Sequence, residues 1–258
     1  MGGGLMQIVT IGRQDEYILG NPQITFFKSV YRRHTNFAIE SIPQIINGEN
    51  NTENTETNGT VTISKTGDLL SKLSIVCPQT TEGINGSELI DEVDIIIGGT
   101  LIDRHTNEWM KVWSELSTPA IKTEGYQYMT GGYSSTSVPS TDQSLVIVPL
   151  HFWFCRYIGL SIPLIALQYH DILVKIKWGI NSDINRDGST SRSSLCELWA
   201  DYIFLDQEER TKFSSIGHEY LIEQVQNIDT SISSPSTKYK LNIFNHPIKE
   251  LIWVEGNT

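Results

Sequence analysis

The chain has 258 residues, of which 39% are hydrophobic and 19% are charged, and its formal net charge is −11. This length suits one large all-β domain or two smaller domains, and the composition excludes global disorder. A net negative field repels phosphate backbones, so we expect no direct binding of nucleic acid.

Residues 1–34 are predicted to form an N-terminal arm that contains a short basic amphipathic helix. Asn21 is a suitable N-cap, and Pro22 suits the first helical position. The run that follows places Lys28, Arg32 and Arg33 beside aromatic residues. These three side chains are candidates for contact with anionic lipid or an acidic neighbour. The alternative is a helix that packs on its own domain and keeps its charges in water.

Short runs of β-branched and aromatic residues then recur at regular intervals, with turn residues between them. This spacing is typical of a β-sandwich or barrel and argues against alternating helices and parallel strands. The predicted strands are 36–46, 60–64, 69–76, 89–97, 100–102, 145–148, 151–154, 172–180, 195–204, 220–225 and 238–243.

Gly98 and Gly99 separate two of these runs, and this pair predicts a hairpin, because a tight hairpin turn needs positive φ. Polar stretches at 47–58, 134–143 and 181–194 are predicted to be exposed loops.

After the N-terminal arm, a helix is expected at 107–116 and a short charged helix or turn at 206–213. In the first, Trp109, Trp113 and Leu116 share one helix face, which we expect to pack in the core.

The three cysteines, Cys77, Cys155 and Cys196, are few and widely spaced. This pattern argues against a disulfide framework or a zinc site, so we expect small buried hydrophobic residues in a reducing compartment. No run is long enough to span a membrane, and the first residues lack the features of a secretory signal.

No motif typical of a catalytic site is present, and the six histidines are scattered without metal-ligand spacing. One segment, with Asp183, Asn185 and Asp187 followed by Gly188, matches the first half of a calcium loop. The bidentate glutamate of such a loop is replaced by Ser194, so an ordinary polar turn is the preferred interpretation. We therefore expect no enzyme activity, no cofactor and no metal.

Several strings resemble the major capsid proteins of the nucleocytoplasmic large DNA viruses, which are of the double jelly-roll type. The resemblance extends from end to end of the chain. Its residues are Met1–Gln7, Gly20–Lys28, Val30–Phe37, Ile102–His105 with Trp109 and Trp113, Pro163–His170, Asp201–Asp206 with Glu209 and Arg210, His218–Gln224 and Phe244–Trp253.

The resemblance implies an all-β fold with an eight-stranded antiparallel jelly roll at 35–226. A linker and the first strand of a second, incomplete jelly roll would follow at 227–258. It implies a structural protein that forms homotrimeric, pseudo-hexagonal capsomers, which tile an icosahedral shell assembled in the host cytoplasm. Minor capsid and penton proteins, and the internal viral membrane near Lys28, Arg32 and Arg33, would be partners.

Two other functions fit an all-β chain of this kind. A carbohydrate-binding jelly-roll module would use a concave sheet face or a calcium loop, which the segment from Asp183 would supply. A cupin-type enzyme would need several histidines and a carboxylate on neighbouring strands, and the scattered histidines argue against it.

Overall fold

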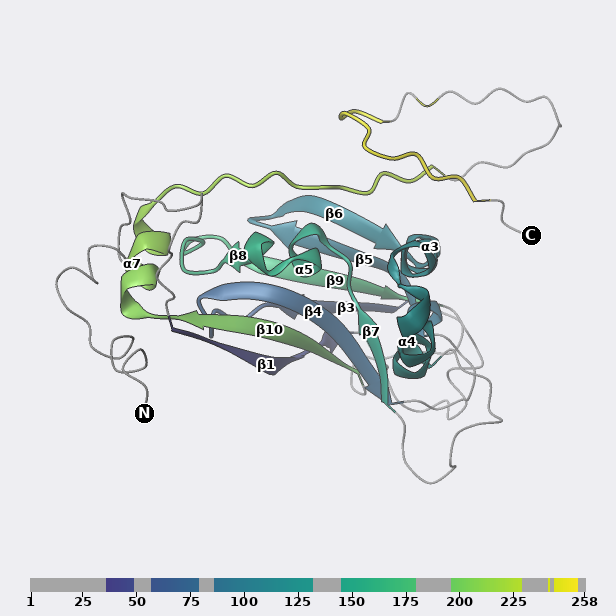
Figure 1. Ribbon diagram of the computed structural model, residues 1–258, viewed down its shortest axis with the longest axis horizontal. Coiled ribbons are helices and arrows are strands. Elements are labelled where there is room, and N and C mark those ends of the chain that lie inside the picture. The colour runs from purple at the N-terminus through teal and green to yellow at the C-terminus, as the bar shows by residue number, and fades with distance from the viewer. Residues whose placement is uncertain are drawn as a thin grey trace, which may run out of the picture.

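The computed structural model describes residues 36–48, 57–78, 86–131, 145–179, 196–228, 241 and 244–254. Two antiparallel sheets pack face to face (Figure 1). The first has the order β1 (Phe37–Ile45), β10 (Glu197–Leu205), β4 (Leu69–Pro78) and β7 (Leu145–Pro149), and β8 (Ile162–Pro163) also pairs with β4. The second has the order β2 (Asn47–Gly48), β3 (Thr57–Thr62), β9 (Ile172–Trp178), β5 (Ile90–Ile97) and β6 (Thr100–Thr106).

The strand order is that of a jelly roll, because strands from distant parts of the chain alternate in each sheet. In the first sheet β10 lies between β1 and β4, and in the second sheet β9 lies between β3 and β5. The predicted all-β jelly-roll fold is therefore confirmed.

The core lies between the two sheets, and buried side chains alternate with exposed or half-buried ones along β7 and β9, whereas on β1 only Gln44 is buried. On β9, Ile172, Val174, Ile176 and Trp178 are buried, while the residues between them are exposed or half-buried. This alternation with period two explains why runs of β-branched residues form strands here.

Most predicted strands are present, with ends shifted by a few residues. The hairpin between β5 and β6 is confirmed, since Gly98 and Gly99 have φ of 58° and 83°. At Gly98 an added Cβ would lie 2.8 Å from Nδ1 of His170, so this glycine also allows a close approach.

Two predicted strands are wrong. Residues 151–154 instead lead into the short helix α5 (Trp153–Arg156), in which Phe152, Trp153 and Phe154 are all buried. In a strand with one face in solvent, every second side chain is exposed. Three consecutive buried side chains do not fit such a strand, so the strand predicted here is wrong. Residues 220–225 run without strand pairing.

The remaining helical elements lie around the rims of the sandwich. They are η1 (Gly86–Leu89), α3 (Asn107–Ser117), η2 (Ala120–Lys122), α4 (Thr123–Thr130), η3 (Ile158–Leu160) and α7 (Gln207–Ser215). The side chains of Thr106 and Asp206 cap α3 and α7 by accepting hydrogen bonds from backbone N–H groups. None of the described helices meets the length and hydropathy needed to cross a bilayer.

The predicted core stripe of α3 is only partly correct. Met110 is the fully buried residue of this helix, Trp109 and Trp113 are half-buried, and Leu116 is exposed. The two indole rings stack on each other, with centroids 5.4 Å apart, at the rim of the core.

The cysteine prediction is also wrong for two of the three residues. Cys77 in β4 and Cys196, immediately before β10, form a disulfide, and their Cα atoms are 4.3 Å apart. The strands are paired so that Glu197 lies opposite Val76, which brings the two cysteines together. Cys155 is free, and burial raises the pKa of its thiol to about 12.

Some predictions fall on residues that the structure does not describe. The basic helix at 23–34, the loops at 134–143 and 181–194, and most of the strand at 238–243 lie outside the described residues. Part of the predicted loop 47–58 is instead β-structure, in β2 and the start of β3. The division into an arm at 1–34, a jelly roll at 35–226 and the start of a second one at 227–258 stays a prediction.

Candidate functional site

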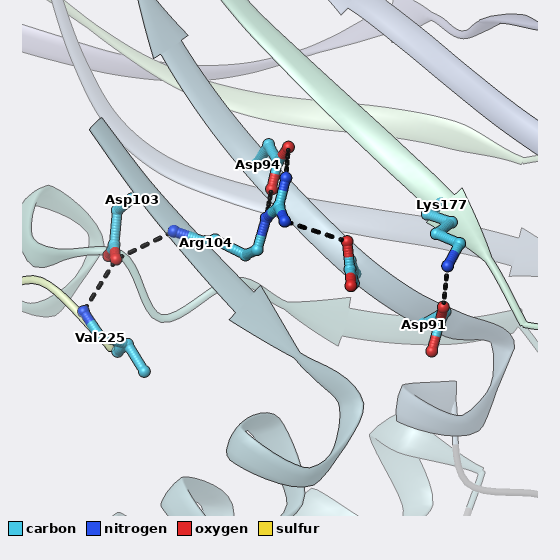
Figure 2. Close-up of polar contacts among 7 residues, drawn as sticks. Asp91, Asp94, Asp103, Arg104, Lys177 and Val225 are labelled. Atoms are coloured by element: carbon cyan, nitrogen blue, oxygen red, sulfur yellow. Dashed lines mark hydrogen bonds and ion pairs between the residues drawn. The ribbon is translucent and has the colours of Figure 1, made fainter. Parts of the chain in front are cut away.

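The outer face of the second sheet carries paired charges, and we call it the charged sheet face (Figure 2). Arg104 on β6 donates two hydrogen bonds to Asp94 on β5, at 2.6 and 2.8 Å, and lies 3.6 Å from Glu92. Lys177 on β9 is 2.8 Å from Asp91. Ion pairs of this exposed kind contribute little stability, but they keep the face compatible with water.

The outer face of the first sheet is different, and we call it the apolar sheet face. Its apolar members, assigned from the pairing register and the burial alternation, are Phe37, Ile39, Pro43 and Ile45 on β1, Trp199 and Leu205 on β10, Val76 on β4, and Leu145, Ile147 and Pro149 on β7. These residues are exposed or half-buried; the side chain of Ile45 is 82% exposed and that of Phe37 is 62% exposed. In the row of Ile39, by contrast, Ile203 and Leu69 are buried, with 4% and 7% of their surface exposed.

The chain after α7 forms a third feature, which we call the strap and which comprises residues 216–228. It runs along β6, the edge of the second sheet (Figure 1). The backbone N–H of Val225 donates to Oδ1 of Asp103 at 2.9 Å, and the Gln224 side chain donates to the carbonyl of Ile102. Tyr220 Oη donates to the carbonyl of Ser161 at 2.9 Å. The strap thus covers the β6 edge through side-chain anchors in place of a backbone ladder.

The side chains of Asp103 and Arg104, which are adjacent on β6, lie on opposite sides of this strand. The Asp103 side chain is buried and accepts hydrogen bonds from the backbone N–H groups of both Arg104 and Val225, whereas the Arg104 side chain lies on the charged sheet face (Figure 2). Adjacent residues of a strand point to opposite faces of the sheet, so Asp103 binds the strap while Arg104 forms ion pairs on the charged sheet face.

An ionic cluster holds the strap from the other side. Glu223 accepts hydrogen bonds from Arg156 and from Lys249, and the Arg156 guanidinium lies 4.3 Å from the centre of the Trp113 ring. The hydrogen bond from Lys249 and the positive charge of Arg156 lower the pKa of Glu223, against an opposing effect of burial. Residues 244–254, which we call the arm, are joined to the strap by Lys249 and by the bond from Asn245 N–H to Gln226.

Two histidines interact electrostatically: His105, which lies beside Asp103, and His151. His105 is 1% exposed, its Nε2 is 3.0 Å from Oδ2 of Asp103, and its ring stacks on Phe152. His151 has its pKa lowered to about 4, first by burial and then by its electrostatic interactions with His105 and Arg156. His151 is therefore neutral at pH 7 in the folded chain.

Acidification should destabilise the fold through His151. In the unfolded chain histidine titrates near pH 6.5, so between about pH 6.5 and 4 the unfolded state binds the additional proton. The stabilising contribution is fully present above pH 6.5 and is lost as the pH falls toward 4. We expect His151→Gln to remove about 2 kcal/mol of the stability loss between pH 7 and pH 5. Urea unfolding of both proteins at the two pH values measures this difference. An identical pH dependence would contradict the role of His151.

The residues that the sequence singled out as site candidates lie elsewhere. Lys28, Arg32 and Arg33, and the calcium-loop candidates Asp183, Asn185 and Asp187, are outside the described residues. In the part of the chain that is described, no group of three or more His, Cys, Asp or Glu side chains could hold a metal ion. Sequence reasoning missed the approach of His105 to His151 and both sheet faces. The only local signal was the alternation Phe37, Ile39, Ser41, Pro43, Ile45.

The structure is an antiparallel jelly roll with one charged and one apolar outer face, and jelly rolls include viral shell proteins, lectins and cupins. Comparison with known proteins decides between these. Residues 25–206 match the family model described as the major capsid protein N-terminus, so the chain belongs to the major capsid protein family of large DNA viruses.

Individual relatives agree with this family. The chain is 47% identical to the major capsid protein of Pyramimonas orientalis virus, over 99% of this chain and 65% of that protein. It is 42% identical to that of Paramecium bursaria Chlorella virus 1, over 98% of this chain and 60% of that protein. The structure also matches a chain of the PBCV-1 virus capsid, with a TM-score of 0.64 and 38% identity over 78% of this chain and 50% of that one. The chain thus spans about half to two thirds of the length of its relatives.

Proposed function

We propose that this chain is a structural component of an icosahedral virus capsid and has no enzymatic role. The observation that carries the proposal is the match of residues 25–206 to the major capsid protein family. The rigid two-sheet sandwich supports it, because such a fold keeps its shape while exposed loops vary. Among the described residues, no observation favours carbohydrate binding, so that alternative is not carried further.

The building unit in this proposal is a homotrimer with a pseudo-hexagonal outline, and many trimers tile the shell. Weak contacts between trimers suffice, because they are repeated across the lattice. Assembly would take place in the host cytoplasm, and minor capsid and penton proteins would complete the virion.

Light scattering coupled to size exclusion tests the trimer. We expect the purified chain to elute with three times the mass of one copy. A folded chain that stays monomeric at high micromolar concentration would contradict the trimer.

The internal viral membrane is a further partner in this proposal, through Lys28, Arg32 and Arg33. The reason is that these three positively charged side chains lie close together in the sequence of a chain whose net charge is −11. We expect flotation with anionic vesicles to be lost when Arg32 and Arg33 are both replaced by glutamate. Flotation that is unchanged in this variant would argue against membrane contact at residues 1–34.

A further inference from the structure

The apolar sheet face is arranged in rows that cross the sheet. In one row Pro43, Trp199, Ser74 and Pro149 lie side by side on the four strands. The next row consists of Ile45, Glu197, Val76 and Ile147. These two rows are mostly apolar and carry few charged side chains, whereas in the row of Ile39 the side chains of Ile203 and Leu69 are already buried.

The exposure of this face is unusual for a sheet whose other side already forms the core. Ile39 is 50% exposed and Leu145 is 58% exposed, in addition to Phe37 and Ile45. From the spacing of strands and the rise per residue, four strands of this length cover roughly 600 Å². A standard interface buries about 800 Å² per partner, so this face supplies most of one interface. Apolar patches of this size on a protein surface mark sites of contact.

The strap and the arm do not cover the apolar sheet face. The strap runs along β6 and the arm contacts the strap, whereas β1 lies at the opposite side of the sandwich (Figure 1). The family model is that of an N-terminal part, and the relatives are longer than this chain.

The charge of the face suits a copy of the same chain. Copies that each carry a net charge of −11 repel one another, so contact between them requires a surface of low net charge. On this face Lys72 lies opposite Asp201, and Glu197 is the other acid of the pairing rows. The local charges therefore nearly cancel, and both signs are available for a self-complementary contact.

We propose that the apolar sheet face is the surface through which one copy of this chain contacts a second copy. This inference rests on the proposed function, since it names the surface used in self-assembly. Sheet stacking at about 10 Å would bury the rows that contain Trp199 and Ile45. The side chain of Ile45 and the edge of β1 that pairs with no described strand would lie within the contact.

Lysine substitution at the two most exposed isoleucines of β1 tests the proposal. The variant Ile39→Lys with Ile45→Lys places two charges on the face at positions that already meet solvent. The matched control is Leu101→Lys on β6, where the side chain is 47% exposed. Sedimentation equilibrium should show self-association at least roughly tenfold weaker in the double variant, and a change of less than about twofold in the control. Circular dichroism checks the fold of each protein.

The outcomes separate this inference from the proposed function. If the unmodified chain assembles and the double variant assembles equally well, the assigned face is wrong while self-assembly stands. If the unmodified chain does not assemble at all, the proposed trimer itself fails.

Cross-linking adds a measurement that needs no disruptive variant. A photoreactive residue at position 45, in mixed copies of different isotope content, should give cross-links between copies. Cross-links that form only within one copy, to residues 1–35, would show that the chain covers its own face and would overturn the proposal.

Discussion

Replacing Cys77 and Cys196 together by alanine is expected to lower the free energy of unfolding by about 4 kcal/mol. The two residues are 119 positions apart, and their disulfide joins β4 to the start of β10 in the first sheet. A bond that closes so long a loop restricts the unfolded chain strongly, which is the main source of its stabilising effect.

Urea unfolding with and without a thiol reductant measures this effect. The reductant should bring the unmodified chain to the stability of the double variant, and it should leave the variant unchanged. Cys155→Ala is the control, because Cys155 is free and its replacement should leave the response to reductant intact. A chain whose unfolding midpoint does not respond to reductant would show that the disulfide contributes nothing to stability.

The second large effect is expected at Asp103. Its replacement by alanine removes the acceptor of two backbone hydrogen bonds, from Arg104 at 3.0 Å and from Val225 at 2.9 Å. It also removes the carboxylate beside His105. Because these groups are buried, we expect a loss of about 3 kcal/mol in the free energy of unfolding.

Hydrogen exchange distinguishes a local from a global effect of this substitution. The amide of Val225 should exchange faster in Asp103→Ala, because the strap loses an anchor on β6. The control is Asp91→Ala, which removes an exposed ion pair with Lys177 and should cost less than about 1 kcal/mol. Equal effects of the two substitutions would mean that Asp103 does not anchor the strap.

The elements that sequence reasoning identified correctly have signals within a few residues. The hairpin of β5 and β6 follows from Gly98 and Gly99, whose positive φ is a local requirement. The helix α7 begins directly after Asp206, an acidic N-cap. The alternation along β9 predicts a strand, and the structure buries every second residue of it.

The errors have one physical cause, which is that burial depends on neighbours that are distant in sequence. The run from Phe152 to Phe154 becomes helical because every side chain there is enclosed. Leu116 is exposed because α3 reaches the core only through Met110. The strap at 220–225 has a strand-like sequence, but its bonds go to side chains of β6 and to the turn at Ser161.

The candidate sites also differ in whether a local sequence pattern could predict them. The sequence placed candidate contacts at Lys28, Arg32 and Arg33, and a weak calcium loop at Asp183, and these stay predictions. The strap anchor joins Val225 to a residue 122 positions away, and no local pattern indicates such a bond. The difference between the two outer sheet faces also required the strand pairing, because alternation alone does not say which side of a strand faces the core.

By itself, the sequence determined the all-β class, the position of most strands and the family, since these depend on residue types at short and regular spacing. Only the tertiary structure decided that Cys77 meets Cys196, that Asp103 anchors the strap, and that β1 turns Phe37, Ile39 and Ile45 outward. Each of these contacts depends on the order of strands in the sheets, which is fixed by the packing of the whole core and not by any single segment.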